Sequence, residues 1–160
     1  MTQTARTLVL GIGNLIMSDD GIGVRVVQKL RDEYTFPDTV TILDGGTLGL
    51  DLLPQLEGID RLILVDAVET GQEPGTCIRL TGEELPIALE TKVSPHQMGL
   101  KDLLSVAELM GHKPGEMVLV GVQPASIEMD TELTPVVQAQ LEVLCDMVLK
   151  ELELWGVSAE

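Results

Sequence analysis

Continuous apolar segments alternate with segments of helical periodicity along most of this chain. The first apolar segment, Thr7–Ile12, is followed directly by Gly13 and lacks a polar–apolar alternation, which is typical of a strand buried on both faces. The next segment, Gly21–Tyr34, places its apolar residues three and four positions apart, which indicates an amphipathic helix. Strands joined through helices favour right-handed crossovers and a parallel sheet covered on both faces. The sequence therefore predicts an α/β fold with three layers, α/β/α.

The rest of the chain continues this alternation. Four more strands are expected over Thr39–Asp44, Arg61–Asp66, Gly75–Thr81 and Glu116–Gln123. Further helices are expected over Leu48–Leu56, Gln97–Met110 and Pro135–Trp155. Residues 82–95 look irregular, and residues 124–134 are expected to form a loop. We therefore expect a single domain over residues 1–160, with a mostly parallel sheet of roughly five strands.

Composition excludes several classes of protein. The 160 residues carry a net charge of −16, which would repel nucleic-acid phosphates and anionic lipid, so neither is an expected partner. Only 2% of the residues are aromatic, too few for a surface that stacks bases, and 44% are hydrophobic, too many for a disordered chain. No apolar run has the length of a membrane span or signal peptide, so we expect a cytoplasmic protein, with Cys77 and Cys145 as reduced thiols.

Ligands bind to sheets of this type beyond the carboxyl ends of the strands, so the residues that follow each strand are candidates. Asp19 and Asp20 lie before the first helix, and the sequence favours helix capping for Asp19, because a carboxylate there interacts favourably with the helix dipole. Asp66 ends the third strand, where a carboxylate must be solvated, paired or bound to metal. A functional role is favoured for Asp66.

Two further segments could contribute to the same edge. Asp44-Gly45-Gly46-Thr47 follows the second strand, and it is either a tight turn closed by the Asp side chain or part of a binding site. His96 precedes a predicted helix, where it could face this edge, although its position alone does not distinguish it from an ordinary loop residue. His112 lies in a polar break and is expected to be a solvated loop residue.

Asp20, Asp66 and His96 together could bind a divalent transition metal. Imidazole nitrogen and carboxylate oxygen suit nickel, zinc and iron, and three protein ligands with an open position are typical of catalytic metal sites. Their long-range spacing carries no specificity of its own. The alternative is a nucleotide-binding protein that uses Gly11, Gly13 and Asp44, but Ile16 stands where the third glycine of a dinucleotide fingerprint belongs.

Five blocks of the sequence, in order along nearly the whole chain, resemble the [NiFe]-hydrogenase maturation endopeptidases. Each block alone is weak, but together they are specific. They are Gly11-Ile12-Gly13-Asn14, Asp19-Asp20-Gly21-Ile22-Gly23-Val24, Asp44-Gly45-Gly46-Thr47, Val65-Asp66-Ala67 and Ser94-Pro95-His96-Gln97.

The resemblance implies a function, a partner and a site. It implies an endopeptidase that removes the C-terminal extension of the hydrogenase large-subunit precursor after nickel insertion, by aspartic-type or metal-assisted hydrolysis. The nickel would come with the substrate, and no organic cofactor is implied. The metal-contacting residues carry over to Asp20, Asp66 and His96, with Asp20 replacing the Glu common in the family. The block tied to substrate recognition carries over to Asp44, Gly45, Gly46 and Thr47.

A non-enzymatic chaperone that binds the nickel-loaded large subunit without cutting it is the second alternative. It would make the same metal contacts but release no peptide. The sequence identifies no Ser-His-Asp or Cys-His arrangement, so we do not expect a covalent nucleophile.

Overall fold

The computed structural model describes residues 5–82, 84–85 and 95–160, and over 95–101 it describes the backbone alone. Within these residues, five strands form one sheet in the order β2-β1-β3-β5-β4. Adjacent strands are parallel except β4, which lies at one edge and pairs antiparallel with β5. The strands are β1 (Thr7–Ile12), β2 (Val40–Gly46), β3 (Arg61–Ala67), β4 (Cys77–Thr81) and β5 (Glu116–Val122).

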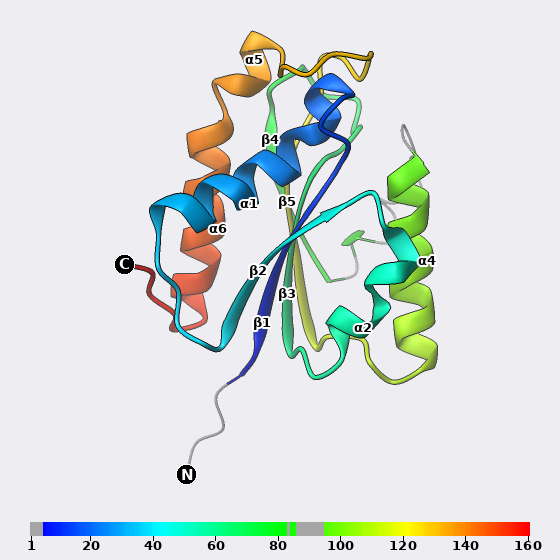
Figure 1. The fold of residues 1–160 in the computed structure, drawn as a ribbon, viewed down its shortest axis with the longest axis vertical. Coiled ribbons are helices and arrows are strands. Elements are labelled where there is room, and N and C mark those ends of the chain that lie inside the picture. The colour runs from blue at the N-terminus through cyan, green and yellow to red at the C-terminus, as the bar shows by residue number, and fades with distance from the viewer. Residues whose placement is uncertain (1–4, 83, 86–94) are drawn as a thin grey trace.

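Helices cover both faces of this sheet (Figure 1). Helix α1 (Ile22–Glu33) and helix α6 (Leu141–Leu154) pack on one face, while α2 (Leu53–Leu56) and α4 (Pro95–Leu109) lie on the other. Two 3-10 turns, η1 (Ser18–Gly21) and η2 (Gly49–Leu52), precede α1 and α2, and the short helix α5 (Pro135–Gln138) precedes α6. The expected three-layer α/β/α fold with a mostly parallel sheet is confirmed.

Side chains that alternate along each strand divide between two aliphatic cores. On β3, Ile63 and Val65 pack with α1 and α6, while Leu62 and Leu64 pack with α2 and α4. All four are fully buried, as expected for a central parallel strand whose apolar run is continuous. The same alternation places the next residue, Asp66, on the face that α2 and α4 cover.

Several expectations about elements need correction. The strand expected over Thr39–Asp44 is β2 over Val40–Gly46, and the helix expected over Leu48–Leu56 is turn η2 followed by α2. The final segment is not one helix over Pro135–Trp155, because α5 ends at Gln138 and α6 begins at Leu141. At the junction the Gln140 N–H bonds to the Val137 carbonyl three residues back, so the chain tightens to a 3-10 turn there. The fourth strand begins at Cys77 rather than Gly75, whose N–H bonds to the Gln123 carbonyl beyond the end of β5.

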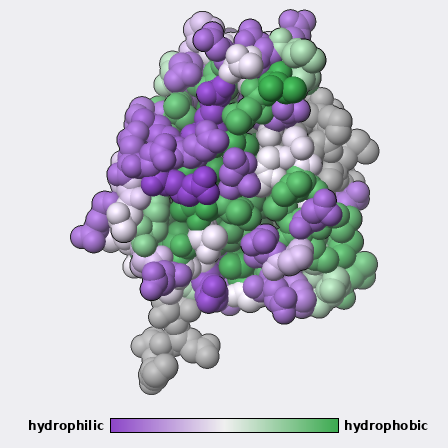
Figure 2. All heavy atoms as spheres, in the orientation of Figure 1, coloured by the Kyte–Doolittle hydropathy of each residue, from purple (hydrophilic) through white to green (hydrophobic). Residues whose placement is uncertain are grey.

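The parallel topology brings several element ends to one edge of the sheet. Strands β1, β2, β3 and β5 all end at the upper edge in Figure 1, which we call the carboxyl edge. Helix α4 runs in the opposite direction to the strands, so its first turn lies at this edge too. Figure 2 shows hydrophilic surface over the outer face of α1, hydrophobic surface at the lower right of the view, and a mixture of both along the upper edge. In the described part of the chain, no helix has the length and apolar character that a membrane span needs.

Candidate functional site at the carboxyl edge

Glycines allow the start of α1 to lie directly against the ends of the strands. A Cβ added to Gly11 would lie 2.3 Å from the Gly23 carbonyl oxygen, and one added to Gly23 would lie 2.1 Å from the Val65 carbonyl oxygen. Gly13 has a φ of +142°, and its Cβ would lie 1.8 Å from the Asp20 carbonyl oxygen. These glycines are therefore required by backbone packing, and their presence needs no bound phosphate to explain it.

The N–H groups of the loop after β1 donate hydrogen bonds to other groups of the protein. The Gly13 N–H donates to the Gly46 carbonyl at 2.9 Å, and the Asn14 N–H donates to an Asp20 carboxylate oxygen at 3.1 Å. The N–H groups of Ile16 and Met17 both donate to Asn14, to its side-chain and main-chain oxygens respectively. A dinucleotide site would aim such donors at a pyrophosphate. This geometry disfavours the nucleotide-binding alternative.

The neighbouring acids Asp19 and Asp20 point in different directions. Asp20 is 2% exposed and accepts the Asn14 N–H, so its carboxylate lies against the loop that follows β1. Asp19 is fully buried and accepts hydrogen bonds from the N–H groups of Ala125, Ser126 and Thr134, at 2.8, 3.1 and 2.8 Å. The interpretation of Asp19 as a helix cap is therefore wrong. Neither η1 nor α1 has a side-chain cap, because Asp19 instead holds a loop more than a hundred residues away.

Asp66 is fully buried near the end of β3. One of its carboxylate oxygens accepts the N–H of the next residue, Ala67, at 2.8 Å. In the sheet, Asp66 pairs with Gly121 of β5. Turn η1, which carries Asp20, contacts β3. The elements that carry Asp20 and Asp66 therefore meet at the carboxyl edge.

His96 lies in the first turn of α4, which begins at Pro95 rather than at the expected Gln97. The helix start therefore places the His96 backbone at the carboxyl edge, on the face of the sheet that also holds Asp66. The His96 side chain and residues 86–94 lie outside the described part of the structure. Among the described residues, no three His, Cys, Asp or Glu side chains form a group that could hold a metal ion.

The Asp44–Thr47 block forms one wall of a cleft of about 310 Å³ at the carboxyl edge. The Asp44 carboxylate accepts the Gly46 N–H at 3.0 Å, so the Asp side chain closes a tight turn, and Gly46 has a φ of +50°. The binding role of this block stays a prediction. Gly45 is buried, and a Cβ there would lie 2.8 Å from a methyl group of Leu10. The residues that line the cleft are Gly13, Asn14, Leu15, Val24, Asp44, Gly46 and Thr47.

A second group of residues at this edge was not anticipated from the sequence. Gln123, directly after β5, is 4% exposed, and its side-chain oxygen accepts the Thr70 N–H at 2.8 Å while its amide nitrogen donates to Glu69. Glu69 lines a pocket of about 150 Å³ together with residues 124–127. Only the position of Gln123 after a buried strand could have indicated this role.

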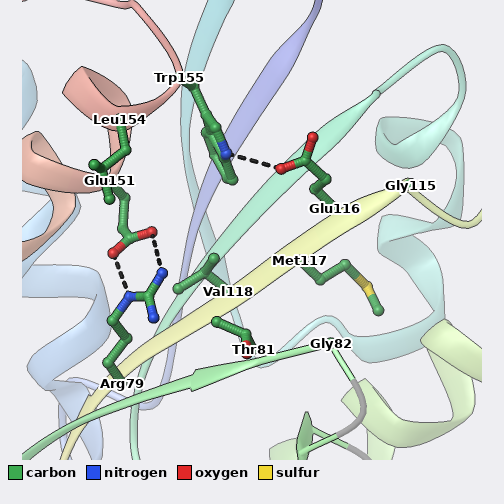
Figure 3. A pocket seen from close by; sticks show the side chains of 10 residues that line it. All are labelled: Arg79, Thr81, Gly82, Gly115, Glu116, Met117, Val118, Glu151, Leu154 and Trp155. Atoms are coloured by element: carbon green, nitrogen blue, oxygen red, sulfur yellow. Dashed lines mark hydrogen bonds and ion pairs between the residues drawn. The ribbon is translucent and has the colours of Figure 1, made fainter.

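A further pocket, of about 290 Å³, lies at the opposite edge of the sheet. Figure 3 shows that Arg79 and Glu151 point toward each other and that Glu116 points toward Trp155. Arg79 donates two bonds to the buried Glu151 carboxylate, at 2.5 and 3.0 Å, and the Trp155 indole N–H donates to Glu116 at 2.9 Å. This hydrogen bonding is consistent with a structural role, in which the pocket's side chains join α6 to the sheet.

Both cysteines are free thiols, as expected. Cys145 is buried against α1, and burial is the main reason that its pKa rises from 9.0 to about 11. Burial also raises the pKa of Cys77, whose thiol lies 3.4 Å from the Gln140 side-chain oxygen. A raised pKa keeps a thiol protonated at neutral pH, and a protonated thiol is a poor nucleophile.

Comparison with known proteins gives a consistent result. Residues 24–151 match the family model described as hydrogenase maturation protease. The Hydrogenase 2 maturation protease of Escherichia coli (strain K12) is 45% identical over 155 residues, which are 96% of this chain and 94% of that protein. The hydrogenase expression/formation protein HupD of Bradyrhizobium diazoefficiens is 43% identical over 159 residues, or 98% of this chain and 83% of that protein.

Solved structures agree with the sequence relatives. The hydrogenase maturating endopeptidase HybD from E. coli superposes with a TM-score of 0.93 at 45% identity, over 96% of each chain. The [NiFe] hydrogenase maturation protease HybD from Thermococcus kodakarensis gives a TM-score of 0.76 at 28% identity, over 91% of this chain and 97% of that one. From the family match, the identity along the whole chain and the shared fold, we conclude that this chain belongs to the hydrogenase maturation protease family.

Proposed function

We propose that this peptidase removes the C-terminal extension of a [NiFe]-hydrogenase large-subunit precursor, and that it recognises the nickel already bound in that precursor. The observation that carries the proposal is the convergence of three element ends at the carboxyl edge. These are turn η1 with Asp20, the end of β3 with Asp66, and the first turn of α4 with His96. Two carboxylates and an imidazole form a donor set that suits nickel.

The different orientations of the neighbouring acids support Asp20 rather than Asp19 as the first metal contact. Asp19 has both carboxylate oxygens bonded to the 125–134 loop. Asp20 lies against Asn14, which also lines the 310 Å³ cleft, so its carboxylate is next to the proposed substrate site. The metal is here part of the substrate, and the enzyme's residues would recognise it.

The surface around the cleft suits a protein substrate. Leu15 lines the cleft, and Ile16, Leu48 and Leu50 follow in the segments that form its walls. All four side chains are exposed, from 36% for Leu15 to 55% for Leu48. Exposed apolar residues grouped around a cleft are typical of a surface that binds another protein. We propose that Asp44, Gly45, Gly46 and Thr47 shape the part of this surface that recognises the precursor.

Peptide hydrolysis adds water across one amide bond, giving a carboxyl group on one product and an amine on the other. An aspartate can take the proton from the attacking water, or the bound metal can polarise the carbonyl group. Correct placement of the scissile bond beside these groups would itself supply several kcal/mol of the barrier reduction. Since Asp20 and Asp66 are at most 2% exposed, the proposal requires neighbouring segments to move when the precursor binds.

The test compares nickel-loaded and nickel-free precursor as substrates, with product masses measured by mass spectrometry. We expect loss of a C-terminal peptide from the loaded precursor alone. An unchanged mass in both would rule out the proposal, and a stable complex without cleavage would indicate a nickel-dependent chaperone. Cleavage of both forms at equal rates would indicate a peptidase that does not recognise the metal.

The roles of the two carboxylates can be separated by kinetics. If Asp20 or Asp66 only contacts the metal, its Asn variant should raise the KM for loaded precursor more than it lowers kcat. If it takes the proton from water, the variant should lower kcat by roughly a hundredfold or more. Circular dichroism of each variant controls for loss of the fold.

A further inference from the structure

The loop over residues 125–134 is fastened to turn η1 by the buried carboxylate of Asp19. One Asp19 oxygen accepts the N–H groups of Ala125 and Ser126, and the other accepts the N–H of Thr134. The Thr134 hydroxyl lies 2.8 and 3.0 Å from the two oxygens. A single carboxylate therefore holds both ends of the loop.

Other contacts join the same two segments. The Ser18 N–H donates to the Asp130 carbonyl at 2.9 Å, and the Asp130 N–H donates to the Ile16 carbonyl at 3.0 Å. The Ser18 hydroxyl donates to the Glu128 carbonyl, and Ser18 has a φ of +52°. A positive φ at a serine is strained and persists where its surroundings hold it. Several hydrogen bonds, from both backbone and side chains, thus join turn η1 and Ile16 to the loop.

The chemistry at position 19 requires a carboxylate. Its three backbone partners are N–H donors, and they approach both oxygens. An ionised carboxylate is a pure acceptor, whereas an asparagine amide would direct two N–H groups at one set of these donors. Asparagine at this site would therefore lose hydrogen bonds and leave buried N–H groups unpaired.

We propose that Asp19 is a positioning residue for peptide hydrolysis. By holding the 125–134 loop, it fixes the turn that carries Asp20 and the pocket that Ala125 and Ser126 form beside Glu69. Both features lie at the carboxyl edge, where the precursor is proposed to bind, so their relative position sets how its scissile bond meets the reactive groups. This inference rests on the proposed peptidase function.

The first experiment compares Asp19→Asn with wild type by hydrogen exchange and by single-turnover cleavage of nickel-loaded precursor. We expect faster exchange of the Ala125, Ser126 and Thr134 amides, with unchanged exchange in β1 and β3. We also expect a cleavage rate at saturating precursor at least tenfold below wild type, with a smaller change in KM. A purely structural role would open the loop without lowering the rate at saturation.

A graded pair tests the same contact at its other end. Thr134→Ser keeps the hydroxyl group and should retain wild-type exchange and cleavage, whereas Thr134→Val removes it and should give an intermediate loss of both. Asp60→Asn is the matched control, because the Asp60 carboxylate also accepts a backbone N–H, from Arg6 at 2.8 Å, but at the opposite edge of the sheet. It should cleave at the wild-type rate.

Two results would overturn the inference. The first is that Asp19→Asn speeds hydrogen exchange of the loop amides, yet the variant still cleaves saturating precursor within twofold of the wild-type rate. The other is an Asp19→Asn protein whose loop amides exchange as slowly as those of wild type. If wild-type protein cleaves no precursor at all, the proposed function fails instead, and hydrogen exchange still tests whether Asp19 holds the loop.

Discussion

At the carboxyl edge, backbone packing determines which residue a position can hold as much as chemistry does. Gly11, Gly13 and Gly23 allow α1 to begin against the strand ends, and this close approach places Asp20 where it is. A glycine-rich segment after a first strand thus has two explanations, a phosphate site or a tight strand–helix contact. The contacts here favour the second, because the N–H groups of the loop bond to carbonyl and carboxylate oxygens of the protein.

Gly13→Ala should strongly destabilise the protein. The left-handed φ at Gly13 is strained for alanine, and the new Cβ would meet the Asp20 carbonyl oxygen. We expect a loss of about 2 kcal/mol or more in the free energy of unfolding, measured with urea. Gly58→Ala is the control, since Gly58 also has a positive φ, +77°, but has nothing within 4 Å of its Cβ position. Equal losses in the two variants would contradict the packing argument.

Cys145 should make stability depend on pH in the alkaline range. Burial raises the pKa of its thiol in the folded state from 9.0 to about 11. The unfolded thiol ionises first as the pH rises, so the stabilisation is present below about pH 9 and is lost as the pH approaches 11. We expect the stability difference between wild type and Cys145→Ala to shrink over this range in urea titrations. If this difference stays constant, the Cys145 thiol does not ionise at a lower pH in the unfolded state than in the folded state.

At the scale of elements, α6 is joined to the antiparallel edge strand β4 by one polar contact. Glu151 on α6 is 4% exposed and receives two hydrogen bonds from Arg79 on β4, which raise the pKa of the Arg79 guanidinium. Removal of one partner from a buried pair leaves an uncompensated charge. Because Arg79 is 48% exposed, solvent screening reduces the effect.

Arg79→Met should therefore lower the free energy of unfolding by about 1–2 kcal/mol, a discounted value for a pair with one exposed partner. Lys29→Met is the comparison, because Lys29 pairs with Glu33 and Glu142 on exposed surfaces of α1 and α6. Thermal melting should show a clearly smaller loss for Lys29→Met. A larger loss for that variant would mean that burial of Glu151 does not set the strength of the Arg79 contact.

Sequence patterns predicted most elements, because burial on both faces of a strand requires a continuous apolar run. The bounds of β1 were predicted without error, and β3 and β5 differ by one residue at one end. The break between α5 and α6 was missed, because apolar residues keep three- and four-residue spacing across the 3-10 turn at Gln140. Local periodicity does not report such a change in hydrogen bonding.

The contacts of the candidate site residues were predicted only in part for a similar reason. Asp44 closes its turn within two residues, a local signal that the sequence carries. The partners of Asp19 lie between 106 and 115 positions further along the chain, and no local sequence pattern indicates them. The parallel topology explains why residues at different strand ends can be candidates for one site, since it gathers distant segments at one edge.

At the scale of the whole molecule, the net charge of −16 includes a set of carboxylates at the carboxyl edge. Asp20, Asp44, Asp66 and Glu69 lie there beside exposed apolar side chains. An acidic edge attracts a cationic group, and an apolar border suits a protein surface. A nickel-loaded precursor would present both features, which gives the edge a substrate that matches its chemistry.

The central claim is tested most directly by the cleavage rate of Asp66→Asn on nickel-loaded precursor. At precursor concentrations below the wild-type KM, the account predicts much slower product formation than in wild type, because either a raised KM or a lowered kcat reduces kcat/KM. The variant should keep a native circular dichroism spectrum and cooperative melting. Asp60→Asn, which changes a carboxylate at the opposite edge of the sheet, should cleave at the wild-type rate. Full cleavage by folded Asp66→Asn would contradict the account and remove Asp66 from the site.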